Sequence, residues 1–255
     1  MKFETILIES TKLPMVKIDR ELFLRKELRD RYKQEIVEKA IQYNPAYAGI
    51  SVEDINKIAE SCIGTETMQV TALSAVSGLP GGFAMIGTVP ADLAQFFAHV
   101  LRILQKLIYL YGWSDLDLDL KELNEETKNL LTLFIGIMLG INRAVDVINK
   151  LGIQVAKQVV KKLPQKALTK GVVYPIIKKV AGLLGAKMTK QIFARGVAKV
   201  IPILGAVTSG GLTFLTFKPM SEKLRRYLAS GKLASVEYYK KFALESLIEV
   251  ETPDI

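Results

Sequence analysis

The sequence predicts an all-α protein, built as one compact multi-helix domain over residues 1–255. Hydrophobic residues make up 49% of the chain and the mean hydropathy is +0.23, which suffices for a large core. No linker rich in Pro, Gly or Ser divides the chain. Apolar residues recur at helical spacing almost throughout, and weak strand-like alternation is confined to residues 2–9. We therefore expect an N-terminal arm over residues 1–15, followed by helices.

Capping and breaking residues place the first helices. Asp19 is a good N-cap for a charged helix that runs to about residue 43, where Asn44 and Pro45 stop it. Ser51, with Asp54 three residues later, predicts the start of a second helix toward residue 62. A final amphipathic helix is expected over residues 221–249, so that residues 229–255 form a C-terminal helix and tail.

Three stretches of the chain carry no formal charge. Residues 67–91 form an uncharged run of 25, longer than the roughly 20 that cross a bilayer. Glycines and a proline at 78–82 interrupt this run, which predicts two short apolar pieces joined by a turn. Residues 129–142 and 200–217 are the other two runs, and both contain glycines that suit close helix packing. Each run fits either a core helix or partial insertion into a membrane.

A helix from Pro90 to about Gly112 has a polar stripe only about 80° wide, so most of its circumference must be buried. The stripe contains Asp92, His99 and Arg102, and His99 is the only histidine of the chain. A carboxylate and a guanidinium beside an imidazole can shift the pKa of the imidazole and create a proton-transfer site. These three residues are therefore the catalytic candidates. The alternative interpretation is that they only solvate the exposed edge of a buried helix, or satisfy one another inside.

Positive charge is concentrated in one region. The chain has 35 Lys and Arg against 26 Asp and Glu, a net charge of +9. Residues 143–200 hold 13 Lys and Arg against one Asp, a local charge of 13 − 1 = +12. Residues 143–163 have helical periodicity with a basic and an apolar face, as in helices that bind anionic lipid. The candidate headgroup-binding residues are Arg143, Lys150, Lys157, Lys161, Lys162, Lys178 and Lys179.

Nucleic acid explains the basic region less well than anionic lipid does, and a solvated helix face explains it equally well. Nucleic-acid binders interleave aromatic residues among their basic residues, and here the region contains only Tyr174 and Phe193. Nucleic acid is therefore disfavoured as a partner. A plain solvated helix face explains the charge as well as lipid does, and that alternative stays open.

An acidic segment offers a weak metal-binding pattern. The candidate ligands occupy positions one, three, five and twelve of an EF-hand loop and are Asp115, Asp117, Asp119 and Glu126. Leu120 stands where an EF-hand needs glycine for its sharp turn. A single cysteine, Cys62, excludes an internal disulfide. We expect neither a metal nor another cofactor.

The order of several short motifs from about residue 13 to residue 227 resembles that of the EcsC family of bacterial proteins, which makes residues 16–228 an EcsC-like region. The motifs are Pro14, Asp19-Arg20, Phe23-Leu24, Gly78-Leu79-Pro80-Gly81-Gly82, Pro90-Ala91-Asp92, Tyr111-Gly112, Ile201-Pro202, Gly205-Ala206-Val207 and Gly210-Gly211. The family is named after a gene beside that of an ABC transporter. The resemblance implies a helical, membrane-associated protein and supplies no catalytic residues.

Together these observations predict a non-catalytic protein that docks on anionic lipid through a basic helical face and supports a transporter or binds an apolar ligand. The N-terminus lacks a basic segment followed by an apolar one, so we expect a cytoplasmic protein, peripheral to or partly inserted in the inner face of the membrane. Two alternatives remain: an enzyme for a lipid-like or small substrate that uses Asp92, His99 and Arg102, and a soluble helical module that binds a protein.

Overall fold

Helices make up nearly all of the structure. The computed structural model describes residues 3–77, 85–86, 89–116, 118, 123–161 and 209–251. The helices are α1 (Phe3–Thr11), α2 (Arg20–Leu28), α3 (Gln34–Gln42), α4 (Val52–Ser77), α5 (Ala91–Leu110), α6 (Glu125–Met138), α7 (Asn142–Lys161), α10 (Ser209–Ala229), the short 3-10 helix η1 (Lys232–Ala234) and α11 (Val236–Glu251). The only strands in the described part are β1 (Met85–Ile86) and β2 (Val89–Pro90), which pair with each other. The all-α prediction is confirmed.

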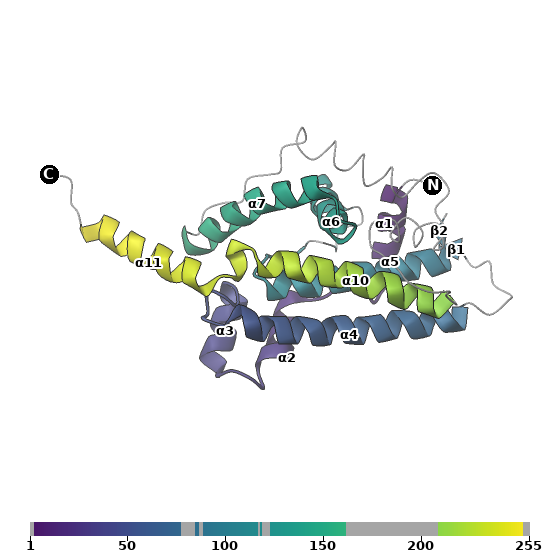
Figure 1. Cartoon of the computed structure of the whole chain (residues 1–255), viewed down its shortest axis with the longest axis horizontal. Helices are drawn as coiled ribbons and strands as arrows, with labels where there is room; N and C mark the ends of the chain where they lie inside the picture. The colour runs from purple at the N-terminus through teal and green to yellow at the C-terminus, as the bar shows by residue number, and fades with distance from the viewer. Residues whose placement is uncertain are drawn as a thin grey trace.

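Helix α5 lies at the centre of the fold. It packs against α1, α2, α4 and α10, and α4 and α10 run side by side along the length of the molecule (Figure 1). Helix α6 packs against α7, α10 and α5, and α6 and α7 lie on the opposite side of α10 from α4 (Figure 1). Helix α11 projects from the end of the molecule at which α3 lies (Figure 1). Nearly all of α5 is buried, as its narrow polar stripe predicts. It ends where Gly112 adopts a φ of +93°, a conformation that favours glycine.

Local capping follows the sequence closely. The Asp19 carboxylate accepts a hydrogen bond of 2.8 Å from the backbone N–H of Leu22, and the Ser51 hydroxyl accepts one of 3.2 Å from that of Asp54. Each cap satisfies a backbone donor that the first turn of a helix leaves without a partner. The predicted starts of α2 and α4 are therefore confirmed.

Helix lengths differ from the prediction in three places. Residues 2–9 were expected to have strand character, but α1 buries Phe3, Ile6, Leu7 and Ser10, whose spacing of three and four is that of one helix face. The helix expected over residues 19–43 is divided into α2 and α3. The final helix expected over residues 221–249 is instead the end of α10 and the start of α11, separated by η1.

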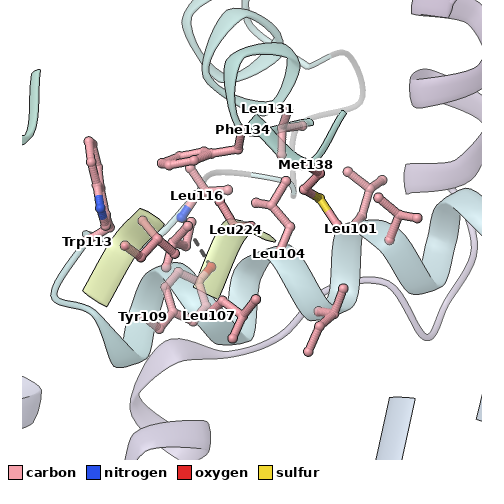
Figure 2. Close-up of a cluster of buried hydrophobic side chains, with 14 of the residues drawn as sticks. Leu101, Leu104, Leu107, Tyr109, Trp113, Leu116, Leu131, Phe134, Met138 and Leu224 are labelled. Carbon is pink, nitrogen blue, oxygen red and sulfur yellow. Dashed lines mark hydrogen bonds between the residues drawn. The ribbon is translucent and has the colours of Figure 1, made fainter. Parts of the chain in front are cut away.

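The core between α5, α6 and α10 is shown in Figure 2. Leu101 and Leu104 of α5 lie toward Leu131, Phe134 and Met138 of α6, and Leu107 of α5 and Leu224 of α10 belong to the same buried cluster (Figure 2). The Trp113 ring lies edge-on to that of Phe134, with 5.1 Å between centroids. The second uncharged run thus supplies a core helix, α6. Within the described ranges, no helix combines the length and the apolar character needed to span a bilayer.

A polar junction joins distant parts of the chain at one end of α5. The Arg20 guanidinium donates to the carbonyls of Ile41 at 2.7 Å, Tyr43 at 3.2 Å and Trp113 at 3.2 Å. It thereby satisfies the last carbonyls of α3, which have no partner within that helix. Next to it, the Asn44 side-chain amide donates to the Tyr239 hydroxyl at 2.7 Å. We call these contacts the Arg20 junction.

Candidate functional site

A cluster of charged side chains is buried between α4 and α5. The Glu66 carboxylate is completely buried, and one of its oxygens lies 2.9 Å from Nδ1 of His99. The other oxygen accepts hydrogen bonds from Nε of Arg102 at 3.0 Å and from Nζ of Lys106 at 2.7 Å. We call these four residues the Glu66 cluster. Its core is one carboxylate surrounded by three donors.

The register of two helices explains how the Glu66 cluster forms. His99, Arg102 and Lys106 are three and then four residues apart, so they project from one face of α5. On α4, the buried positions Ile58, Cys62 and Glu66 share a face at spacings of four. Glu66 therefore occupies a position that is otherwise apolar, and the polar stripe of α5 lies opposite it.

Electrostatics keep the Glu66 carboxylate ionised. Burial acts to raise its pKa, because a charge loses hydration in the interior. The hydrogen bond from His99 and the positive charges of Lys106 and Arg102 outweigh burial and lower the pKa to about 2. The charge of the carboxylate is thus compensated within the core, as a buried charge requires.

The same stripe of α5 also holds the chain that precedes α2. Arg102 donates to the carbonyl of Met15 through Nη1. The amide of Gln105 donates to the carbonyl of Val16 at 2.9 Å and accepts from the backbone N–H of Ile18 at 3.0 Å. Arg102 of the stripe and Gln105 beside it therefore satisfy backbone groups of residues 15–18, while Arg102 also binds Glu66.

His99 has one ring nitrogen without a hydrogen bond. Nδ1 is held by Glu66, while Nε2 is buried and has no hydrogen-bond partner among the described residues. Cys62, one turn before Glu66, is not an activated nucleophile, since burial, with a smaller contribution from Glu27, raises the pKa of its thiol to about 12.

The structure brings together only two of the three catalytic candidates. His99 and Arg102 share Glu66, whereas Asp92 is exposed in the first turn of α5, about two turns from His99. Glu66, which the sequence analysis did not single out, provides the acidic partner. Its signal in the sequence is an acid at a core position of an amphipathic helix.

The basic face of α7 is the second feature that bears on function. Arg143, Lys150 and Lys157 are exposed, and we call them the α7 basic face. The opposite side of α7 packs into the protein through Ala144, Val147, Ile148 and Ala156, all buried. Among the residues that the structure describes, no carboxylate forms an ion pair with these three side chains, although exposed Asp146 lies on the same helix.

The other headgroup candidates lie at or beyond the end of α7. Lys161 is the last residue of α7. Lys162, Lys178 and Lys179 fall outside the described residues. The basic amphipathic character predicted for residues 143–163 is thus seen in the part of α7 whose side chains the structure describes.

The EF-hand-like candidates are only partly described. Asp115 is exposed and accepts a hydrogen bond of 2.6 Å from the hydroxyl of Tyr109, and Glu126 is exposed in the first turn of α6. Asp117 and Asp119 lie outside the described residues. Over the described ranges, no three potential ligands gather closely enough to hold a metal ion.

Comparison with known proteins gives no match from which a function could be inferred. No protein-family model, curated protein or solved structure matches the chain. The resemblance to the EcsC family therefore remains a prediction. Function has to be inferred from the Glu66 cluster, which is closed and internally compensated, and from the α7 basic face, which is open.

Proposed function

We propose that this is a non-catalytic protein that docks on an anionic membrane surface through the α7 basic face and the basic residues that follow it in the chain. The observation that carries the proposal is the exposure of Arg143, Lys150 and Lys157 on a helix whose other side is buried in the core. Their charges point outward, and the helix is held firmly enough to present them together.

The charges of this face are sufficient for weak docking. Near an anionic bilayer each Lys or Arg contributes about 1 kcal/mol, so three of them change the affinity by roughly a hundredfold. The region from residue 143 to 200 has a net charge of +12, which allows further contacts of the same kind. No carboxylate of the described structure has to release these three side chains before they bind lipid.

The shape of the described protein favours docking over insertion. Ala144, Val147, Ile148 and Ala156 of α7 are already packed into the core, so the described part of this helix presents mainly its charged residues to the surroundings. The resemblance to the EcsC family adds a membrane setting and a transporter as a candidate partner. Both stay part of the proposal.

Vesicle flotation of the full chain tests the proposal. We expect recovery with vesicles of phosphatidylglycerol and phosphatidylcholine, little recovery with phosphatidylcholine alone, and release by salt, which screens exposed charges. The triple variant Arg143→Glu, Lys150→Glu, Lys157→Glu should lose roughly a hundredfold or more in affinity, since each site changes from attraction to repulsion.

A matched control reverses three basic residues elsewhere. Arg29, Arg31 and Lys33 are exposed between α2 and α3 and lie in the electrically neutral first 60 residues. Their simultaneous replacement by Glu changes the net charge by the same amount and should reduce affinity far less. Equal losses in both triple variants, or equal recovery with neutral and anionic vesicles, would refute docking through the α7 basic face.

A further inference from the structure

A cavity beside α7 has the character of a ligand site. It has a volume of about 320 Å³ and is bounded by α7, the end of α10 and η1. This volume is at the lower end of the range found for small-molecule sites in proteins, roughly 300–1,000 Å³. We infer that this cavity binds a small anionic amphiphile, a carboxylate on a short apolar chain.

The floor of the cavity is apolar and aromatic. Trp113, Ile148, Leu228 and Leu233 line it, and all four side chains are buried. The Trp113 ring is fixed on its other side by Phe134, against which it packs edge-on (Figure 2). A rigid aromatic wall with three aliphatic side chains favours the apolar part of a ligand.

The polar lining residues lie at the surface. Asn149, Ser230 and Lys232 line the same cavity and are exposed, so they form its mouth. Among the described residues that line the cavity, Lys232 alone carries a formal charge. Neither Asp146 nor Glu237, the acids closest along the chain, lines it, although burial and the charge of Asp146 raise the pKa of the lining residue Tyr227. A ligand with an apolar chain and an anionic end therefore matches both the floor and the mouth.

Neighbouring lysines of α7 increase the positive potential at the mouth. Ile153 lines the cavity, and exposed Lys150 and Lys157 are three residues before it and four residues after it. Residues at these spacings are neighbours on a helix surface. The amino group of Lys232 lies 5.4 Å from the centre of the Tyr238 ring, a cation–π contact on a residue that does not line the cavity.

Gly152 leaves the space that the ligand would occupy. A Cβ atom at this position would lie 3.6 Å from Cζ2 of Trp113 and 3.9 Å from Cδ1 of Leu233. These are ordinary contact distances, so the backbone can accept a side chain here. Any side chain at position 152 would fill the floor of the cavity next to Trp113, and Gly152→Leu is therefore the natural blocking variant.

The only tryptophan of the chain reports directly on the cavity, since Trp113 lines it. The experiment is a fluorescence titration of the full protein with decanoate below micellar concentrations. We expect a saturable change in Trp113 emission. Decanol, which has the same chain and no charge, should bind roughly tenfold more weakly, because it cannot form the charge-assisted contact with Lys232.

Three variants complete the test. Lys232→Glu should weaken decanoate binding roughly tenfold or more, while Lys240→Glu, an exposed lysine of α11 that does not line the cavity, should leave it unchanged. Gly152→Leu should abolish the emission change while circular dichroism shows an intact helical fold. The surface substitution at Lys232 keeps the test decisive even if Gly152→Leu fails to fold.

The outcomes separate this inference from membrane docking. No saturable change in emission, equal affinity for decanoate and decanol, or an unaffected Lys232→Glu variant would each overturn it. Saturable binding of decyl phosphate but not of decanoate would likewise overturn the assignment of a carboxylate ligand. Vesicle flotation depends on the α7 basic face, so either proposal can fail while the other stands.

Discussion

The Glu66 cluster and the α7 basic face each contain three basic side chains, and they use them in opposite ways. In the Glu66 cluster, His99, Arg102 and Lys106 surround one buried carboxylate. On the α7 basic face, no carboxylate of the described structure pairs with the three basic residues, and all three are exposed. Similar charges thus stabilise the fold in one region and remain accessible to a partner in the other.

This difference predicts where substitutions act. A buried charge that loses its partner is costly, because it keeps neither hydration nor compensation. Removing an exposed charge that has no partner changes the free energy of unfolding little, and it mainly weakens the binding of a ligand or surface at that site. Stability and binding should therefore respond to different residues of this chain.

Replacing Glu66 should have the largest effect on stability. Glu66→Leu leaves the half-buried Arg102 and Lys106 without their counter-charge, and we expect a loss of about 3 kcal/mol in the free energy of unfolding. Chemical denaturation measures it. Glu60→Leu on the same helix is the matched control, because Glu60 is half exposed and pairs with Arg225 at 3.3 Å. Similar losses in the two variants would show that the Glu66 cluster stabilises the fold no more than the exposed ion pair of Glu60 and Arg225.

Acid should remove the contribution of Glu66. Its pKa is about 2 in the folded protein and 4.5 as the ordinary value, so the unfolded chain binds the proton first as the pH falls. The stabilisation is complete above pH 4.5 and is lost between about pH 4.5 and 2, by an amount on the order of 3 kcal/mol. Denaturation across this window measures the loss, and Glu66→Gln should flatten it. An unchanged pH profile in that variant would contradict the assignment.

Removing Arg102 should have an intermediate effect. Arg102→Leu takes away a hydrogen bond to Glu66 and one to the Met15 carbonyl, but Lys106 and His99 still compensate the carboxylate. We expect a loss of about 1.5–3 kcal/mol, typical of hydrogen bonds to charged groups. Hydrogen exchange at residues 15–18 should rise with it. A loss of stability without faster exchange there would separate Arg102 from the chain before α2.

Reversing the α7 basic face should have the smallest effect on stability. Arg143→Glu near the start of α7 favours the helix dipole and Lys157→Glu near its end opposes it, so the two changes offset each other. The unfolding midpoint of the triple variant should match that of the parent, although vesicle binding is lost. A marked fall in the midpoint would mean that these side chains stabilise the fold.

The sequence predicted the fold class and much of the local structure for physical reasons that are local. Asp19 and Ser51 cap helices as expected, and the narrow stripe from Asp92 to Lys106 correctly predicted a buried α5. The division between α2 and α3 was missed because residues 29–33 contain no glycine or proline, so the break depends on tertiary packing. The extent of α10 was missed for the opposite reason, since Gly210, Gly211 and Pro219 lie within that helix.

The candidate site was only half predictable. His99 and Arg102 stood out because they share a stripe on one helix, a periodic signal. The sequence favoured Asp92 as their acidic partner, because Asp92 is close to them along the same helix. In the structure the partner is Glu66, because the packing of α4 against α5 brings Glu66 opposite His99 and Arg102. Such a register is set by packing between helices and leaves no spacing rule in the chain.

The Arg20 junction has a consequence for dividing the protein into pieces. Arg20 binds carbonyls at both the end of α3 and the end of α5, and Asn44 reaches Tyr239 across nearly the whole length of the chain. A fragment that ends in one of the loops would keep only one partner of each of these hydrogen bonds and would leave that partner exposed. Expressed separately, such halves should stay unfolded until they recombine, so a shortened form of the protein folds only if it keeps both ends.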